Sequence, residues 1–175
     1  IDALALQRVP VDPVAALREA VEQCTPLASV AGVRIDAKLG ESGSLWLLAD
    51  SQRLRQLLSI LLDNAVRYSH PQGCVSVSLQ AQADEQGRQH CEVCIADQGI
   101  GISKDELPRI FERNFRGASA RLHRADGTGR GLAIGAALAR AHGGSIDLES
   151  EPGHGTIVRL RLPLLREPTL LLSDT

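Results

Sequence analysis

The stretch "CVSVSLQAQADEQGRQHCEVCIAD", residues 74–97, decides the fold. Apolar and polar residues alternate over 74–82, which is typical of a β-strand with one buried face. The segment "CEVCIAD" (91–97) is more apolar and predicts a second, more deeply buried strand. Between them, "DEQGRQ" contains turn-forming residues. The stretch therefore predicts a β-hairpin.

Three segments with helical spacing of apolar residues flank this hairpin. Asp50 and Asp12 are suited to be N-cap residues, because a carboxylate there accepts hydrogen bonds from the free N–H groups of a first helical turn. Pro13 follows Asp12 at the first helical position, where its missing N–H is not needed. The third segment begins in the glycine-rich stretch "GTGRGLAIGAALARAHGG". The expected helices cover about 13–31, 51–68 and 127–142.

Two further hairpins are expected outside the central one. "VRIDAKL" (33–39) alternates, and "LWLLA" (45–49) reads as its short hairpin partner. Near the end of the chain, "SIDLES" (145–150) and "TIVRLRLPL" (156–164) form a terminal hairpin around "EPGHG". Antiparallel hairpins mixed with helices, without regular βαβ alternation, predict an α/β two-layer sandwich. Its sheet is mixed and mostly antiparallel, and its three main helices lie on one face.

The remaining segments carry less regular patterns. Residues 103–111 predict a short helix, whereas the arginine-rich residues 112–126 show neither period and predict a mobile loop. A chain of 175 residues is expected to form a single domain. We expect its core to span about 10–163 and its tail, 164–175, to be frayed.

Composition excludes several classes of protein. A net charge of −2, with one Trp, one Tyr and two Phe, gives no basic or aromatic surface for nucleic acid. No apolar run reaches membrane-spanning length. Because the chain begins at Ile1 and contains no Met, we expect it to be a fragment of a longer protein, the rest of which spans a membrane.

The spacing of Cys91 and Cys94, "CEVC", is that of a zinc or redox motif. No second cysteine pair or paired histidines follow to complete four zinc ligands. On a strand, moreover, residues three apart face opposite sides. We expect the cysteines to be free thiols in a reducing cytosol.

The glycines of residues 127–131 open a helix, where free N–H groups and the helix dipole favour an anion. A P-loop is excluded because neither of the lysines, Lys38 and Lys104, follows a glycine. A dinucleotide fingerprint is excluded because its third glycine is replaced by Leu132. Because glycines also serve as turns and helix breakers, this stretch taken alone favours phosphate binding only weakly.

Five segments occur in a set order along the chain: "LLDNAVRY" (61–68), "DQGIG" (97–101), "IFERNFRG" (110–117), "GTGRGL" (127–132) and "GHGT" (153–156). Together they are far more specific than any one of them. The set resembles the catalytic, ATP-binding domain of bacterial sensor histidine kinases, of the superfamily shared with gyrase, the Hsp90 chaperones and the MutL proteins. The resemblance covers about residues 10–163 and implies the Bergerat-type ATP-binding fold.

Two of these segments carry polar groups with a chemical role. Asn64 shares a helix face with Leu57, Leu61 and Tyr68, so it is either a core amide bonded to backbone or, as the resemblance implies, a magnesium ligand through its oxygen. Asp97 ends a strand, where its carboxylate either bonds local N–H groups of a turn or accepts from the amino group of adenine.

The resemblance implies the remaining site residues. Asn64, Arg67 and Arg116 are the expected catalytic residues, and Asn64 is the metal ligand. Asn114 and Arg130 depart from the aromatic or apolar residues usual in the family at these positions. The expected nucleotide-binding residues are Asn64, Arg67, Tyr68, Asp97, Gly99, Gly101, Ile102, Phe111, Arg116, Gly127, Thr128, Gly129, Arg130, Gly131, Leu132 and Thr156.

The implied activity is transfer of the γ-phosphate of ATP, with Mg²⁺, to a histidine on a separate dimerisation domain. The implied partners are that upstream domain and a response regulator, with a homodimer in the full-length protein only. The implied location is the cytoplasmic side of a bacterial inner-membrane sensor. The alternatives are a superfamily ATPase with a conformational cycle and a degenerate nucleotide-binding module. Hydrolysing relatives carry a glutamate one turn before Asn64, where this chain has Ile60, which disfavours the ATPase.

The histidines lie in or beside predicted loops, and none has the acidic and proline context of a phosphoacceptor. We expect them to be solvated surface residues and the phosphoacceptor to lie outside this chain. They are His70, His90, His123, His142 and His154.

Overall fold

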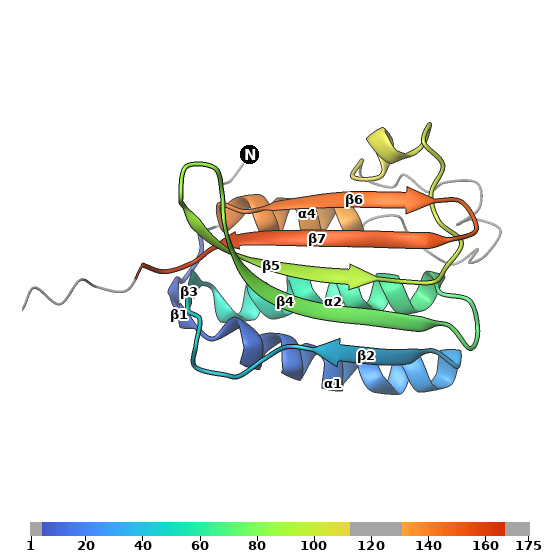
Figure 1. Cartoon of the computed structure of the whole chain (residues 1–175), viewed down its shortest axis with the longest axis horizontal. Coiled ribbons are helices and arrows are strands. Elements are labelled where there is room, and N and C mark those ends of the chain that lie inside the picture. The colour runs from blue at the N-terminus through green and yellow to red at the C-terminus, as the bar shows by residue number, and fades with distance from the viewer. Residues whose placement is uncertain (1–4, 113–130, 167–175) are drawn as a thin grey trace, which may run out of the picture.

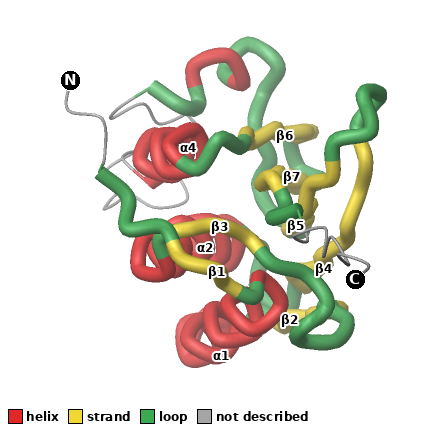
Figure 2. The backbone as a smooth tube through the Cα atoms, turned by 90° about the vertical axis from the view of Figure 1, so that its left-hand side faces the viewer, coloured by secondary structure: helices red, strands yellow, loops and turns green. Residues whose placement is uncertain are grey.

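Helices α1, α2 and α4 lie along one face of a five-stranded sheet, so the structure has two layers (Figures 1 and 2). The computed structural model describes residues 5–112 and 131–166. This arrangement confirms the predicted α/β sandwich. The helices are α1 (Pro13–Ala31), α2 (Ser51–Tyr68) and α4 (Gly131–Ala141). The sheet strands, in spatial order, are β2 (Arg34–Lys38), β4 (Cys74–Ala83), β5 (Gln89–Ala96), β7 (Gly155–Pro163) and β6 (Ser145–Glu151).

The first two helices begin at the carboxylates that the sequence indicates. Asp12 accepts from the N–H groups of Val14 and Ala15, and α1 ends at Gly32 in the left-handed conformation, with φ of 69°. Asp50 caps α2 in the same way, by accepting from the first-turn N–H groups. Both predicted starts are confirmed.

Antiparallel pairing joins β4 to β5, β5 to β7 and β7 to β6. The central and terminal hairpins are therefore confirmed. The predicted hairpin of 33–39 with 45–49 is wrong. Instead, β2 pairs in parallel with β4, and β3 (Leu47–Ala49) pairs antiparallel with β1 (Val9–Val11) in a separate two-stranded sheet.

The physical reason for this difference is the burial of β3. Leu47 and Ala49 are each 2% exposed and belong to the hydrophobic core, so this segment packs against the core and does not extend the sheet. Its partner β1 is a three-residue strand containing Pro10, too short to show alternation in the sequence.

Between β5 and α4 the chain is less regular. The short helix expected over 103–111 is a single 3₁₀ turn, η1 (Leu107–Arg109). The loop predicted over 112–126 lies almost wholly outside the described residues, as do the first four residues of the third predicted helix and the tail from residue 167.

The core lies between the two layers. α2 supplies half of its largest fully buried side chains, and the inward faces of β4, β5 and β7 supply the opposite wall. None of the described helices is both long and apolar enough to span a membrane. Fully buried side chains include Leu17, Leu57, Leu61, Leu62, Val75, Ile95 and Leu160.

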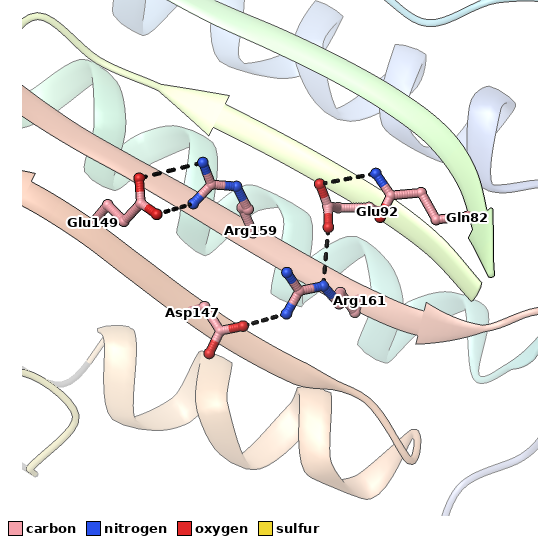
Figure 3. Close-up of polar contacts among 6 residues, drawn as sticks. All are labelled: Gln82, Glu92, Asp147, Glu149, Arg159 and Arg161. Carbon is pink, nitrogen blue, oxygen red and sulfur yellow. Dashed lines mark hydrogen bonds and ion pairs between the residues drawn. The ribbon is translucent and has the colours of Figure 1, made fainter. Parts of the chain in front are cut away.

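The other face of the sheet is polar and carries a row of ion pairs (Figure 3). Arg161 contacts Glu92 at 2.9 Å between Nε and Oε2, and it also pairs with Asp147. Arg159 holds Glu149 through both guanidinium nitrogens, at 3.1 and 3.3 Å. The charges alternate across β5, β7 and β6, so this face presents a ladder of paired groups of opposite charge.

Cys91 and Cys94 lie on opposite faces of β5, as the strand period predicts. Cys91 is buried beneath the helices, and burial raises the pKa of its thiol to about 12. Cys94 is half-buried on the open face. The thiols of both residues, and those of Cys24 and Cys74, are free.

One histidine assignment is wrong. His142 is only 5% exposed, because its Nδ1 donates to the carbonyl of Leu138 at 2.8 Å and its Nε2 accepts from the N–H of Asp50 at 3.2 Å. It therefore joins the end of α4 to the start of α2. His70 and His154 are exposed as expected, and His123 lies outside the described residues.

His90 also departs from the expected loop position. It lies within β5 and is half-buried, and its Nε2 is buried without a hydrogen-bond partner in the described part of the chain.

Candidate functional site

Three polar side chains form a row at one end of the helix-facing side of the sheet. Asp97 follows β5, Thr156 lies in β7 and Ser150 lies in β6, and these strands are adjacent. The register places Ser150 opposite Thr156, and the N–H of Asp97 donates to the carbonyl of Thr156 at 2.9 Å. The next row inward is apolar, with Ile95 and Leu148 both paired to Val158. The polar row therefore borders the core.

Asp97 has the electrostatics of a buried acceptor. Its Oδ1 accepts from the N–H of Thr156 at 3.2 Å. Burial raises the pKa of its carboxyl to about 6, while the backbone N–H groups of Thr156 and Gly99 and the charge of His70 act to lower it. A carboxylate offers about four acceptor positions, so capacity remains for a ligand donor. The turn and adenine interpretations are thus compatible with each other.

The glycines beside Asp97 are required by the protein's own backbone. A Cβ at Gly99 would overlap the carbonyl of Tyr68, and one at Gly101, which has φ of +71°, would overlap the carbonyl of Glu151. Gly155, with φ of +110°, lies equally close to the carbonyl of Asp97. These residues let the loop after β5 and the turn before β7 pack tightly together.

A half-buried stripe on α2 connects this loop to the start of α4. Ile60 lies beside Gly131 and Gly135, with its Cγ2 at 3.5 and 3.6 Å from a Cβ placed at each. Two turns later, the carbonyl of Tyr68 accepts from the N–H of Ile100 at 3.2 Å. Asn64 lies between these contacts on the same helix face. Its side chain is half-buried and has no hydrogen-bond partner within the part of the chain that the structure describes.

The structure brings together Tyr68, Asp97, Gly99, Gly101, Ile102 and Thr156, and it places Gly131 against the stripe of α2. Arg67 is exposed, Phe111 is half-buried just after η1, and Leu132 packs partly buried against the core. The remaining candidates lie outside the described residues: Arg116, Gly127, Thr128, Gly129 and Arg130, together with Asn114.

Ser150 is the residue that the sequence interpretation missed. Its Oγ contacts the N–H of Ile102 at 2.8 Å and the hydroxyl of Thr156 at 2.8 Å. The signal was present in "SIDLES", because Ile146, Leu148 and residue 150 share one face of the strand, and a serine ends an otherwise apolar row.

The sequence and the fold agree with known proteins. Residues 49–166 match the family described as histidine kinase-, DNA gyrase B- and HSP90-like ATPases, and the chain belongs to this family. It is 40% identical over 118 residues to the sensor histidine kinase YkoH of Bacillus subtilis (strain 168), a match covering 67% of this chain and 24% of YkoH. The chain thus spans about a quarter of the length of the curated relatives it matches.

Solved structures give the same result. The mycobacterial sensor histidine kinase MprB superposes with a TM-score of 0.77 at 32% identity, covering 89% of this chain and 98% of the MprB chain. Full-length ShkA, in complex with AMPPNP, superposes with a TM-score of 0.76 at 31% identity, covering 96% of this chain and 33% of ShkA. The fold is that of histidine kinase catalytic domains.

Proposed function

We propose that this chain is the catalytic domain of a sensor histidine kinase, which binds Mg-ATP and transfers the γ-phosphate to a histidine on a separate dimerisation domain. The observation that carries this proposal is the half-buried carboxylate of Asp97, which accepts from the N–H of Thr156 at the edge of the core. Family membership and the likeness to ShkA, whose structure contains an ATP analogue, support it.

Asp97 would hold the adenine, because a carboxylate accepts from the exocyclic amino group of adenine, and guanine offers a carbonyl at that position. Thr156, whose backbone N–H already positions the Asp97 carboxylate, would complete the base pocket. At the other end of the site, the N-terminal turn of α4 would take the phosphates together with Gly127, Gly129 and Arg116.

The site also fits a divalent cation. Asn64 presents an amide that is half-buried and without a hydrogen-bond partner among the described residues, on the α2 face between Ile60 and Tyr68. Its oxygen is a ligand type that Mg²⁺ prefers. Bound Mg²⁺ would neutralise charge on the phosphates, and the rest of catalysis would be positioning of the γ-phosphate for in-line attack.

Hydrolysis is the less favoured activity. Ile60 occupies the position where hydrolysing relatives carry a glutamate, and it packs against Gly131 and Gly135 of α4. An aliphatic side chain cannot deprotonate water, and a general base typically contributes about 100- to 10,000-fold. The geometry therefore supports phosphoryl transfer to a partner over hydrolysis.

The phosphoacceptor domain, the response regulator, dimerisation in the full-length protein and a place in a bacterial inner-membrane sensor belong to the same proposal. In this proposal the chain is one domain of a longer kinase.

Radiolabelled ATP tests the proposal. The chain alone, with ATP and Mg²⁺, should neither label itself nor release phosphate appreciably. Adding the histidine-containing dimerisation domain in trans should produce acid-labile label on that domain. Rapid phosphate release by the chain alone would favour the ATPase, and absence of any ATP binding by calorimetry would contradict both.

A further inference from the structure

The hydroxyl of Ser150 makes three contacts, which reach two segments of the site. It lies 2.8 Å from the N–H of Ile102, 2.9 Å from the carbonyl of Gly155 and 2.8 Å from the hydroxyl of Thr156. The first belongs to the loop after β5, and the other two begin β7. Ser150 is itself half-buried at the end of β6.

Counting protons fixes the direction of every one of these bonds. The N–H of Ile102 can only donate, so Ser150 accepts there. The carbonyl of Gly155 can only accept, so Ser150 donates its single hydroxyl proton to that carbonyl. Because Ser150 has no second proton, the hydrogen bond between Ser150 and Thr156 requires that the Thr156 hydroxyl donates its proton to Ser150. Ser150 is thereby saturated, with one proton donated and two lone pairs filled.

This assignment decides what Thr156 can offer a ligand. Its hydroxyl proton is committed to Ser150, so only its lone pairs remain for a further partner. The neighbouring Asp97, once ionised, is also an acceptor. The polar row therefore presents two acceptors and no side-chain hydroxyl donor. A 6-amino purine supplies two N–H groups to such a pair, directly or through water, whereas a 6-oxo purine supplies a carbonyl oxygen that neither residue can bind.

We propose that Ser150 is a positioning residue that sets base specificity by holding the Thr156 hydroxyl as an acceptor. The inference rests on the proposed function, because it assumes that the base lies against Asp97 and Thr156. Without Ser150, the Thr156 hydroxyl is free to rotate and to donate to a 6-oxo group.

The test compares ATP with inosine triphosphate, which carries an oxygen in place of the 6-amino group and has the same phosphates. Titration calorimetry should give the affinity of each nucleotide for wild type, Ser150→Ala and Ser150→Thr. Ser150→Ala should lower the preference for ATP by about three- to tenfold, the effect of one neutral hydrogen bond. Ser150→Thr keeps a hydroxyl and should keep the wild-type preference for ATP over inosine triphosphate. Ser145→Ala, an exposed position on the same strand, is the matched control and should change neither affinity.

A purely structural role for Ser150 would weaken both nucleotides equally, so an unchanged preference in Ser150→Ala overturns the inference. Thr156→Val provides an independent arm, useful also if Ser150→Ala does not fold. It should lower the preference similarly, and adding Ser150→Ala to it should change the preference no further. An additional loss in the double variant, or an unchanged preference in Thr156→Val, overturns the inference. Failure of wild type to bind ATP at all would instead reject the proposed function.

Discussion

The two faces of the sheet use polar residues from the same three strands in opposite ways. On the open face, Arg159 and Arg161 pair with acidic side chains in solvent (Figure 3). On the helix-facing side, Asp97, Thr156 and Ser150 form a short row bordering the core. The open face has more charge, but on the helix-facing side burial raises the pKa of the Asp97 carboxyl, directly after β5. The comparison teaches that desolvation of an acceptor, and not density of charge, distinguishes the side on which we propose the nucleotide site.

The largest effect is expected where the backbone of the site is most crowded. Gly155→Ala places a methyl group against the carbonyl of Asp97 and forces a side chain into φ of +110°. We expect it to lower the free energy of unfolding by about 3–5 kcal/mol. Gly153→Ala is the control, because its φ is +80° but nothing lies within 4 Å of the added atom. It should cost only about 1–2 kcal/mol. Equal losses in urea denaturation would contradict the crowding argument.

Asp97→Asn is expected to have the next largest effect, on binding. The variant can still accept from the N–H of Thr156, so the fold should persist, but an NH₂ group replaces one acceptor oxygen. ATP affinity should fall by the equivalent of about 1.5–3 kcal/mol, measured by calorimetry. A folded variant with unchanged affinity would remove Asp97 from the base pocket.

The ionisation of Asp97 predicts a pH dependence of somewhat smaller size. Because the pKa of the carboxyl is raised to about 6, the acceptor is ionised above pH 6 and protonated below it. ATP affinity should therefore fall about tenfold from pH 7 to pH 5. The phosphates of ATP titrate equally with any variant, so Asp97→Asn is the reference. Parallel pH profiles for the two proteins would count against the assignment.

The smallest effect is expected on the open face. Arg161→Met breaks contacts to Glu92 and Asp147, but the arginine is partly exposed to solvent, which screens both ion pairs. Stability should fall by about 0.5–1 kcal/mol, and less at high salt. ATP affinity should not change. A measurable loss of ATP affinity would show that the two faces are coupled.

Local chemistry made much of this fold predictable. The carboxylates Asp12 and Asp50 define helix starts, and alternation over 74–82 defines a strand, because these signals lie within a few residues of each other. The parallel pairing of β2 with β4 was not predictable in this way. It joins segments that lie 40 residues apart in the sequence. The pairing depends on how α2, which lies between them in the chain, packs against the sheet.

The candidate site likewise contains residues that the sequence predicts and residues that it does not. Asp97 and Asn64 stand out in the sequence as polar residues at apolar positions, whereas the role of Ser150 depends on three contacts made across two loops. The burial of His142 was also not predicted, because it results from the end of α4 packing against the start of α2. Tertiary contacts of this kind leave no periodic signal in the sequence.

The pairing of Asp97 with Thr156 joins residues 59 positions apart, and this has a kinetic consequence. The β4–β5 and β6–β7 hairpins form from neighbouring segments, so they should appear early in folding. Docking of β5 on β7 must close a much longer loop and should come late. A ligand that bridges Asp97 and Thr156 would then recognise only a chain that has passed its folding barrier. We expect ATP to slow unfolding in stopped-flow experiments and to leave the folding rate unchanged.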